Sequence, residues 1–272
     1  MRGLIVTADD FGLHERVNEA VALAHREGVL NCASLMVGAP AAAHAVRVSR
    51  ANPGLRVGLH IVLADGPATS PASEIPALVG SDGRFEDRMV RDGFRFFCLP
   101  RVRRQLAREI RAQFEAFAAT GLALDHVNTH KHFHLHPTVL SLILRIGRDF
   151  GMHAMRLPRE PDAPLALRPW MALVRARLAR AGIAHNDHVF GMARSGAMDT
   201  AALLDALARL PQGVTEIYCH PAMRADTPIT ESMRDYRHAD ELNALLSPRV
   251  ASAIESAGLV RGGFADVFPH RR

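Results

Sequence analysis

Short apolar segments typical of β-strands alternate with helical segments along the whole length of this chain. Strands are predicted at residues 4–8, 32–37, 57–62, 124–129, 154–157, 188–190, 215–219 and 259–264. Helices are predicted at residues 15–27, 41–50, 102–120, 138–150, 170–181, 200–210, 235–246 and 248–257. Alternation of this kind favours a parallel sheet covered by helices, which places the chain in the α/β class.

Eight strand–helix units in 272 residues suit a single domain over residues 1–272, built as an irregular (β/α) barrel similar to a TIM barrel. An open, doubly wound sheet is the alternative. One segment interrupts the rhythm, because residues 64–99 are rich in proline, glycine and serine. We predict that this segment is an irregular insertion.

The positive charge of the chain comes almost entirely from arginine, with a formal net charge of +5 and Lys131 as the only lysine. Arginine spread along helices favours solvated helix faces, and no nucleic-acid-binding motif is present, so we expect no nucleic-acid partner. Cys32, Cys98 and Cys219 are odd in number and lie far apart, which indicates reduced thiols in a cytoplasmic protein. We also expect neither a signal peptide nor a membrane span, since no apolar run approaches about 20 residues.

Two adjacent carboxylates, Asp9 and Asp10, follow the first predicted strand. Side by side they repel each other, and burial would penalise both charges, so a divalent cation is the simplest compensation. One carboxylate could then ligate the metal while the other handles protons. Adjacent residues of a strand point to opposite faces, so both can reach one pocket only if the backbone leaves extended geometry after Ala8. The alternative is a solvated pair that begins a turn before Gly12.

Histidines stand near the ends of three other predicted strands. His60 falls in the third strand, His130 follows the fourth and His220 follows the seventh. In parallel α/β folds the active site lies at the carboxyl ends of the strands, so these side chains can converge although they are distant in sequence. One aspartate with two histidines is a suitable ligand set for a catalytic divalent metal and leaves positions open for water and substrate.

The segment from His126 to His136 is dense in histidine. If its strand continued, His130, His132 and His134 would share one face and form an alternative metal set. We favour instead a role for His132 and His134 in the pocket wall or as groups that orient the ligands. Arg156, at the end of a further strand, is predicted either to bind substrate or to form a salt bridge at the rim.

These motifs resemble the YdjC-like family of carbohydrate deacetylases. The matching segments are Thr7–Gly12, Gly58–His60, the His126–His136 run and Tyr218–Pro221, which occur in family order and span most of the chain. Two further segments, 94–106 and 140–148, resemble the hopanoid biosynthesis-associated branch of the family.

The resemblance implies a metal-dependent hydrolase that removes the acetyl group from an N-acetylated sugar. In the hopanoid branch the implied substrate is an N-acetylglucosaminyl hopanoid lipid, and chitooligosaccharides are the alternative. The matched positions imply that Asp10, His60 and His130 bind one divalent metal ion, Mg²⁺ or Zn²⁺. They also imply that Asp9 is the catalytic base and His220 the acid. Pro221 would hold His220 in extended geometry.

Two other functions are compatible with the sequence. A metal-dependent sugar isomerase also uses carboxylates and histidines at a barrel mouth, although it would normally have more carboxylates. A non-catalytic sugar- or lipid-binding protein could keep the fold, but the complete set of acid, base and ligands disfavours it. Acetate release from N-acetylglucosaminyl compounds would separate all three, and the sequence leaves a homodimer open.

The insertion ends in a segment where aromatic and basic residues mix. Phe94, Phe96, Phe97 and Leu99 stand among five arginines at positions 91, 95, 101, 103 and 104. Aromatic anchors beside basic residues suit contact with an anionic lipid surface, which would place the protein at the inner membrane surface. The alternative, slightly favoured from sequence, is that the aromatic rings pack under the following helix.

Overall fold

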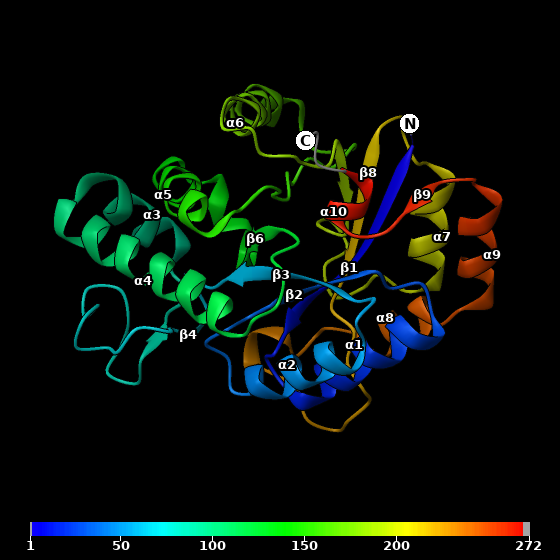
Figure 1. Cartoon of the computed structure of the whole chain (residues 1–272), viewed down its shortest axis with the longest axis horizontal. Helices are drawn as coiled ribbons and strands as arrows, with labels where there is room; N and C mark the ends of the chain where they lie inside the picture. The colour runs from blue at the N-terminus through cyan, green and yellow to red at the C-terminus, as the bar shows by residue number, and fades with distance from the viewer. Residues whose placement is uncertain (1, 269–272) are drawn as a thin grey trace.

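Parallel strands form a strongly curled sheet with helices packed around its outer face in the computed structural model, which describes residues 2–268 (Figure 1). The strands are β1 (Gly3–Phe11), β2 (Cys32–Leu35), β3 (Arg56–Ile61), β4 (Gly66–Pro67), β5 (Arg84–Phe85), β6 (Val127–Thr129), β7 (His188–Phe190), β8 (Val214–Cys219) and β9 (Val260–Arg261). The helices are α1 (Glu15–Glu27), α2 (Ala42–Ala51), α3 (Met89–Cys98), α4 (Pro100–Ala119), α5 (Pro137–Gly147), α6 (Arg168–Arg180), α7 (Thr200–Ala208), α8 (His238–Leu245), α9 (Pro248–Ser256) and α10 (Phe264–Val267).

The strands of the sheet run in the order β6-β3-β2-β1-β8-β7, with β9 beside the start of β1, and all pairs are parallel. Isolated bridges continue the curl beyond β6: Val127 pairs with Met155, and Ala154 pairs with Ala184 in the segment that leads into β7. The predicted α/β fold, an irregular barrel, is therefore confirmed, and the alternative of an open sheet is wrong. Single bridges stand where a regular barrel would have a full strand.

The inner face of the curled sheet changes from apolar at one end to ionic at the other. On β1, Leu4 belongs to the core between sheet and helices, whereas Ile5 packs inside the sheet, as the period of two requires. Ile5 lies in a small apolar cluster with Phe264 and Val267 of α10, which fill the end of the sheet where the strands begin. Farther along the same inner face come polar residues, Thr7 and then Asp9. The functional site therefore lies at the carboxyl ends of the strands.

Three segments differ from the prediction. The insertion is largely ordered, since β4 and β5 pair as a hairpin and residues 89–98 form α3, whose buried face packs against Phe133. The predicted strand 259–264 is split between β9 and α10, because Asp125 accepts the backbone N–H groups that begin α10. Residues 154–157 form only bridges. No helix within residues 2–268 is long and apolar enough to cross a membrane.

Candidate metal centre and active site

A change of backbone geometry at the end of β1 brings its two carboxylates to the same region. The register of β1 against β2 shifts between Ala8 and Phe11, and Asp10 has a φ of 61°. That left-handed conformation is uncommon for a residue other than glycine and marks functional sites. The backbone thus leaves extended geometry after Ala8, as the adjacent aspartates require. Asp9 keeps the direction of the inner face, and Asp10 turns toward β3 and β6.

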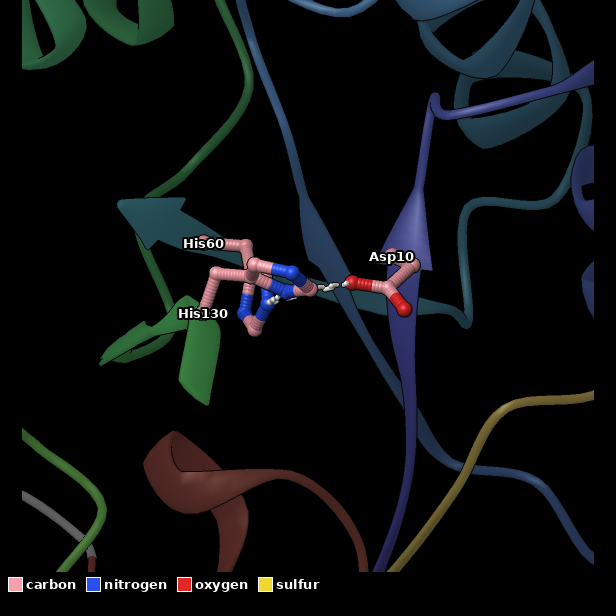
Figure 2. A group of neighbouring side chains, drawn as sticks. All are labelled: Asp10, His60 and His130. Atoms are coloured by element: carbon pink, nitrogen blue, oxygen red, sulfur yellow. Dashed lines mark hydrogen bonds and ion pairs between the residues drawn. The ribbon is translucent and has the colours of Figure 1, made fainter. Parts of the chain in front are cut away.

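Asp10, His60 and His130 lie together at the ends of three different strands, and all three are buried (Figure 2). The Oδ1 atom of Asp10 is 3.3 Å from Nε2 of His60 and 3.1 Å from Nδ1 of His130. One potential ligand atom from each residue lies within 4.8 Å of the other two. Apart from these ion-pair contacts, the buried oxygens of Asp10 have no hydrogen-bond partner among residues 2–268. This donor set fits a divalent cation.

Electrostatics keeps Asp10 ready to bind a cation. Burial by itself would raise the pKa of Asp10, but the neighbouring His130 and His60 imidazoles hold it well below its usual range. The carboxylate is therefore ionised at neutral pH, which is the form that ligates metals.

Asn128 and a glycine hold His60 in place. The Cβ atom of any other residue at position 58 would lie 2.4 Å from the ring of His126, so only glycine lets β3 approach β6 this closely. Nδ1 of His60 is 2.6 Å from Oδ1 of Asn128, and the amide nitrogen of Asn128 donates to Asp9 and Ser34. Since an amide oxygen only accepts, Nδ1 of His60 carries a proton, so Nε2 is the nitrogen that faces Asp10 and could ligate a cation.

Asp9 takes part in a buried ionic network with Arg156 and Glu216. Two nitrogens of Arg156 lie 2.6 and 3.0 Å from the two oxygens of Asp9, and Arg156 also donates to both oxygens of Glu216. Burial would raise the pKa of Asp9, but the Arg156 guanidinium holds it far below its usual range. Arg156 has no exposed surface, so the predicted salt bridge at the rim is wrong. It lies behind Asp9, with its guanidinium 4.4 Å from the centre of the Tyr218 ring.

A cavity of about 140 Å³ opens onto this cluster. Asp9, His60 and His130 line it together with three further rings, those of His132, Tyr218 and His220. Its remaining walls include Ser195 and Tyr236, whose hydroxyl oxygens are 3.0 Å apart. The cavity therefore brings the ionised Asp9 and two candidate ligands to the same space as His220.

His220 follows β8, and its backbone is fixed on both sides. Its N–H donates to the Glu241 carboxylate, and its carbonyl accepts from Nδ1 of His238. Its ring lies between Tyr218 and Tyr236, at centroid distances of 5.5 and 5.2 Å. Nδ1 of the His220 ring has no hydrogen-bond partner within the described part of the chain. The ring is therefore held by packing and retains a free nitrogen that could exchange a proton.

The histidine run does not continue as a strand. After β6 the chain forms a 3₁₀ segment, His130–Leu135, in which Lys131 and His132 both have positive φ. The strand face that His130, His132 and His134 would share as an alternative metal set therefore does not form. His132 reaches the cavity, with Nε2 3.0 Å from the Tyr218 hydroxyl, whereas His134 is fully buried against Thr129. Burial lowers the pKa of both rings, to about 3 for His134, so both are neutral at pH 7.

Several residues of the site were not predicted from the sequence, and two of them carried a usable signal. Asn128 precedes His130 by two residues, and Glu216 precedes His220 by four, so both stand at even spacing from a candidate site residue. Tyr236 carried no such signal. Lys131, the only lysine of the chain, pairs with Asp65 and Asp87 of the insertion.

A second acidic and histidine-containing group, Cys32, Asp125 and His126, lies deeper in the sheet. Its polar atoms bond to each other and to neighbours: Asp125 accepts from His126 and from the first turn of α10, and Nε2 of His126 contacts Ser34. We interpret this group as structural.

Comparison with known proteins places the chain in one family. Residues 3–256 match the family model described as YdjC-like protein. A carbohydrate deacetylase of Brevibacillus brevis is 32% identical over 261 residues, which cover 92% of this chain and 94% of the relative. A chitooligosaccharide deacetylase of Salmonella schwarzengrund is 30% identical over 274 residues, with 98% and 99% covered.

The fold also occurs in a solved structure. The crystal structure of a putative cellobiose-phosphate cleavage protein from Enterococcus faecalis has a TM-score of 0.78 and 23% sequence identity, and 97% of each chain is covered. At this identity the likeness concerns the fold alone.

Proposed function

The chain belongs to the YdjC-like protein family, and we propose that it is a metal-dependent carbohydrate deacetylase that hydrolyses the acetamido group of an N-acetylated sugar. The observation that carries the proposal is the juxtaposition of Asp10, His60 and His130 beside a cavity that also receives Asp9 and His220. The two relatives named as carbohydrate and chitooligosaccharide deacetylases support the substrate class.

Asp10, His60 and His130 would hold the cation. When bound, a divalent ion polarises a carbonyl group and makes water easier to deprotonate. Two imidazoles with one carboxylate suit Zn²⁺, whereas Mg²⁺ prefers oxygen ligands and would keep more water. Both ions therefore enter the test.

Asp9 and His220 would carry the protons of the reaction. Asp9 is ionised and faces the cavity, so it can accept a proton from the water that adds to the acetyl carbon. When the C–N bond breaks, His220 as imidazolium would give a proton to the leaving nitrogen. The products are acetate and the free amine of the sugar. Arg156 would hold Asp9 in position and keep it ionised until the proton transfer, without touching the substrate.

The test is acetate release from chitobiose, used throughout in its N-acetylated form (N,N′-diacetylchitobiose), by protein that has been stripped with a chelator and then reconstituted with Zn²⁺ or Mg²⁺. We expect acetate only with a metal present, and none from Asp10→Asn. Isomerised sugar without acetate would favour the isomerase, and sugar binding without turnover would favour the binding protein. Undiminished acetate release after complete metal removal would contradict the metal dependence.

A glycolipid is a second candidate substrate, and the exposed apolar face of α3 favours it. We propose that an N-acetylglucosaminyl hopanoid is deacetylated with a higher kcat/KM than chitobiose. Presenting both substrates to the reconstituted protein in the same detergent checks this, and a preference for chitobiose would contradict it. The cytoplasmic location, the contact with the inner membrane surface and the homodimer stay predictions.

A further inference from the structure

Helix α3 presents a row of large apolar side chains to solvent. Val90, Phe94 and Phe97 follow one another at the spacing of one helix face and are 92%, 70% and 59% exposed. Leu99, just after the helix, is 44% exposed. Single exposed apolar residues are ordinary, but a contiguous group that includes two phenylalanines marks a surface that binds something.

This exposure is not the result of a loosely attached helix. The opposite face of α3 is buried, with Phe96 packed 5.3 Å from the ring of Phe133 and 6.2 Å from that of His136, measured between centroids. A Cβ atom on Gly93 would lie 3.4 Å from the ring of His136, which is ordinary van der Waals contact, so the backbone of α3 also lies beside this ring. The sequence left open whether these aromatics pack or face outward, and the structure divides them. Phe96 packs and Phe94 faces solvent, whereas Phe97 is mostly exposed but keeps its ring 6.5 Å from that of His136, measured between centroids.

The surroundings of this apolar row are positively charged. Residues 88–104 contain six arginines and one acidic residue, Asp92, which pairs with Arg95. Arg88, just before the helix, and Arg91, in its first turn, share a single carboxylate, that of Glu86. Arg101 and Arg104 are exposed at the start of α4. Aromatic side chains ringed by arginine complement a surface that is apolar inside and negative outside, which describes an anionic lipid bilayer.

The same segment is tied to the rim of the cavity. Lys131, next to His130, lies 2.7 Å from Asp87, just before α3, and 2.9 Å from Asp65 at the start of the insertion. Phe133 and His136, on which α3 packs, belong to the chain that continues directly from His130. Any external surface to which α3 binds would therefore lie near the cavity.

We infer that α3 is a membrane-surface helix, which inserts Phe94 and Phe97 into an anionic bilayer and holds the cavity beside the lipid headgroups. Its arginines contact acidic headgroups, and the apolar row enters the boundary between headgroups and acyl chains. The inference concerns a binding surface and stands independently of the deacetylase reaction.

The test is co-sedimentation with phosphatidylcholine vesicles made with and without phosphatidylglycerol. We expect the wild-type protein to pellet with the anionic vesicles at low salt and to be released at high salt. Removing two phenylalanine side chains that would enter the bilayer should weaken partitioning at least about tenfold, so Phe94→Ser/Phe97→Ser should stay in the supernatant. The matched control is Leu165→Ser/Leu173→Ser, which removes two exposed leucines outside α3 and should pellet as wild type does.

Both double variants should keep the wild-type circular dichroism spectrum and the wild-type rate on soluble chitobiose, because the altered side chains lie outside the cavity. Equal recovery of wild type with neutral and anionic vesicles would overturn the inference. So would unchanged binding by Phe94→Ser/Phe97→Ser, or equal loss of binding in the leucine control. A wild-type dimer that ignores vesicles and becomes monomeric in Phe94→Ser/Phe97→Ser would assign the surface to a second copy of the chain instead.

Discussion

The Nδ1 atom of His60 lies 2.6 Å from the Oδ1 atom of Asn128. This single bond fixes which nitrogen of His60 faces Asp10, and it joins β3 to β6 at the depth of the site. Because the other end of the Asn128 amide donates to Asp9, one side chain orients both a candidate ligand and the candidate base.

We predict that Asn128→Ala weakens metal binding by about 10- to 100-fold, since groups that orient a ligating histidine typically contribute this much. Isothermal titration of the stripped protein with Zn²⁺ measures the change. Ser34→Ala is the matched control, because it removes another partner of Asn128 but leaves the bond to His60 intact. Equal affinities of Asn128→Ala and wild type would refute the orienting role.

Asp9→Asn and Asp10→Asn should separate base from ligand, although the two residues are adjacent. The first should lower turnover by about 10²–10⁴ while the protein retains its metal, because a general base is lost. The second should lose the metal itself. Metal content by atomic emission and acetate release, measured on the same preparations, check both outcomes. A metal-free Asp9→Asn protein would show that Asp9 had been given the wrong role.

Arg156→Met should lower the free energy of unfolding by about 3–5 kcal/mol, since it leaves Asp9 and Glu216 buried without their cation. Urea denaturation measures this. Arg108→Met is the control, because Arg108 forms an exposed ion pair with Glu74 and its removal should change stability by about 1 kcal/mol or less. Similar effects of the two substitutions would mean that the buried network contributes little.

His134→Gln should reduce the loss of stability on acidification. Burial, aided by Arg156, lowers the pKa of His134 to about 3, whereas the unfolded value is near 6.5. As the pH falls, the unfolded chain therefore binds this proton before the folded chain does. The free energy of unfolding is unaffected by His134 well above pH 6.5 and decreases as the pH falls from 6.5 toward 3. Between pH 6.5 and 5 this amounts to about 2 kcal/mol.

Urea denaturation at both pH values checks this prediction. The increase in the free energy of unfolding with pH should be smaller in His134→Gln than in wild type. It should remain above zero, because the pKa of His132 is lowered in the same direction. If the free energy of unfolding of His134→Gln depended on pH as steeply as that of wild type, the buried, neutral state of His134 would be contradicted.

The strand ends were predictable because each apolar run is followed directly by a polar residue. That pattern placed Asp10, His60 and His130 at one edge of a parallel sheet, and the structure brings them together. Their role as ligands stays a prediction. The required break in β1 was also foreseeable, since two adjacent strand residues cannot otherwise face one pocket.

The partners of buried charges were not predictable from local patterns. Glu216 stands in the middle of an apolar strand, and its cation, Arg156, is sixty residues away on a segment that forms only bridges. Helix α3 was missed because Gly93 and closely spaced arginines weaken its helical pattern, and its packing partner, Phe133, lies on a distant segment. In both cases a long-range contact stabilises what the local sequence leaves open.

The position of β1 between β2 and β8 has a consequence for how the protein is made. The strand that carries Asp9 and Asp10 leaves the ribosome well before its second neighbour, β8, and before α10. Until β8 is synthesised, one edge of β1 is unpaired, and the ionic network of Asp9 with Arg156 and Glu216 is incomplete. Contacts of such long sequence separation slow folding and leave edges exposed. A chain interrupted before residue 214 would therefore contain every candidate metal ligand and still lack a site.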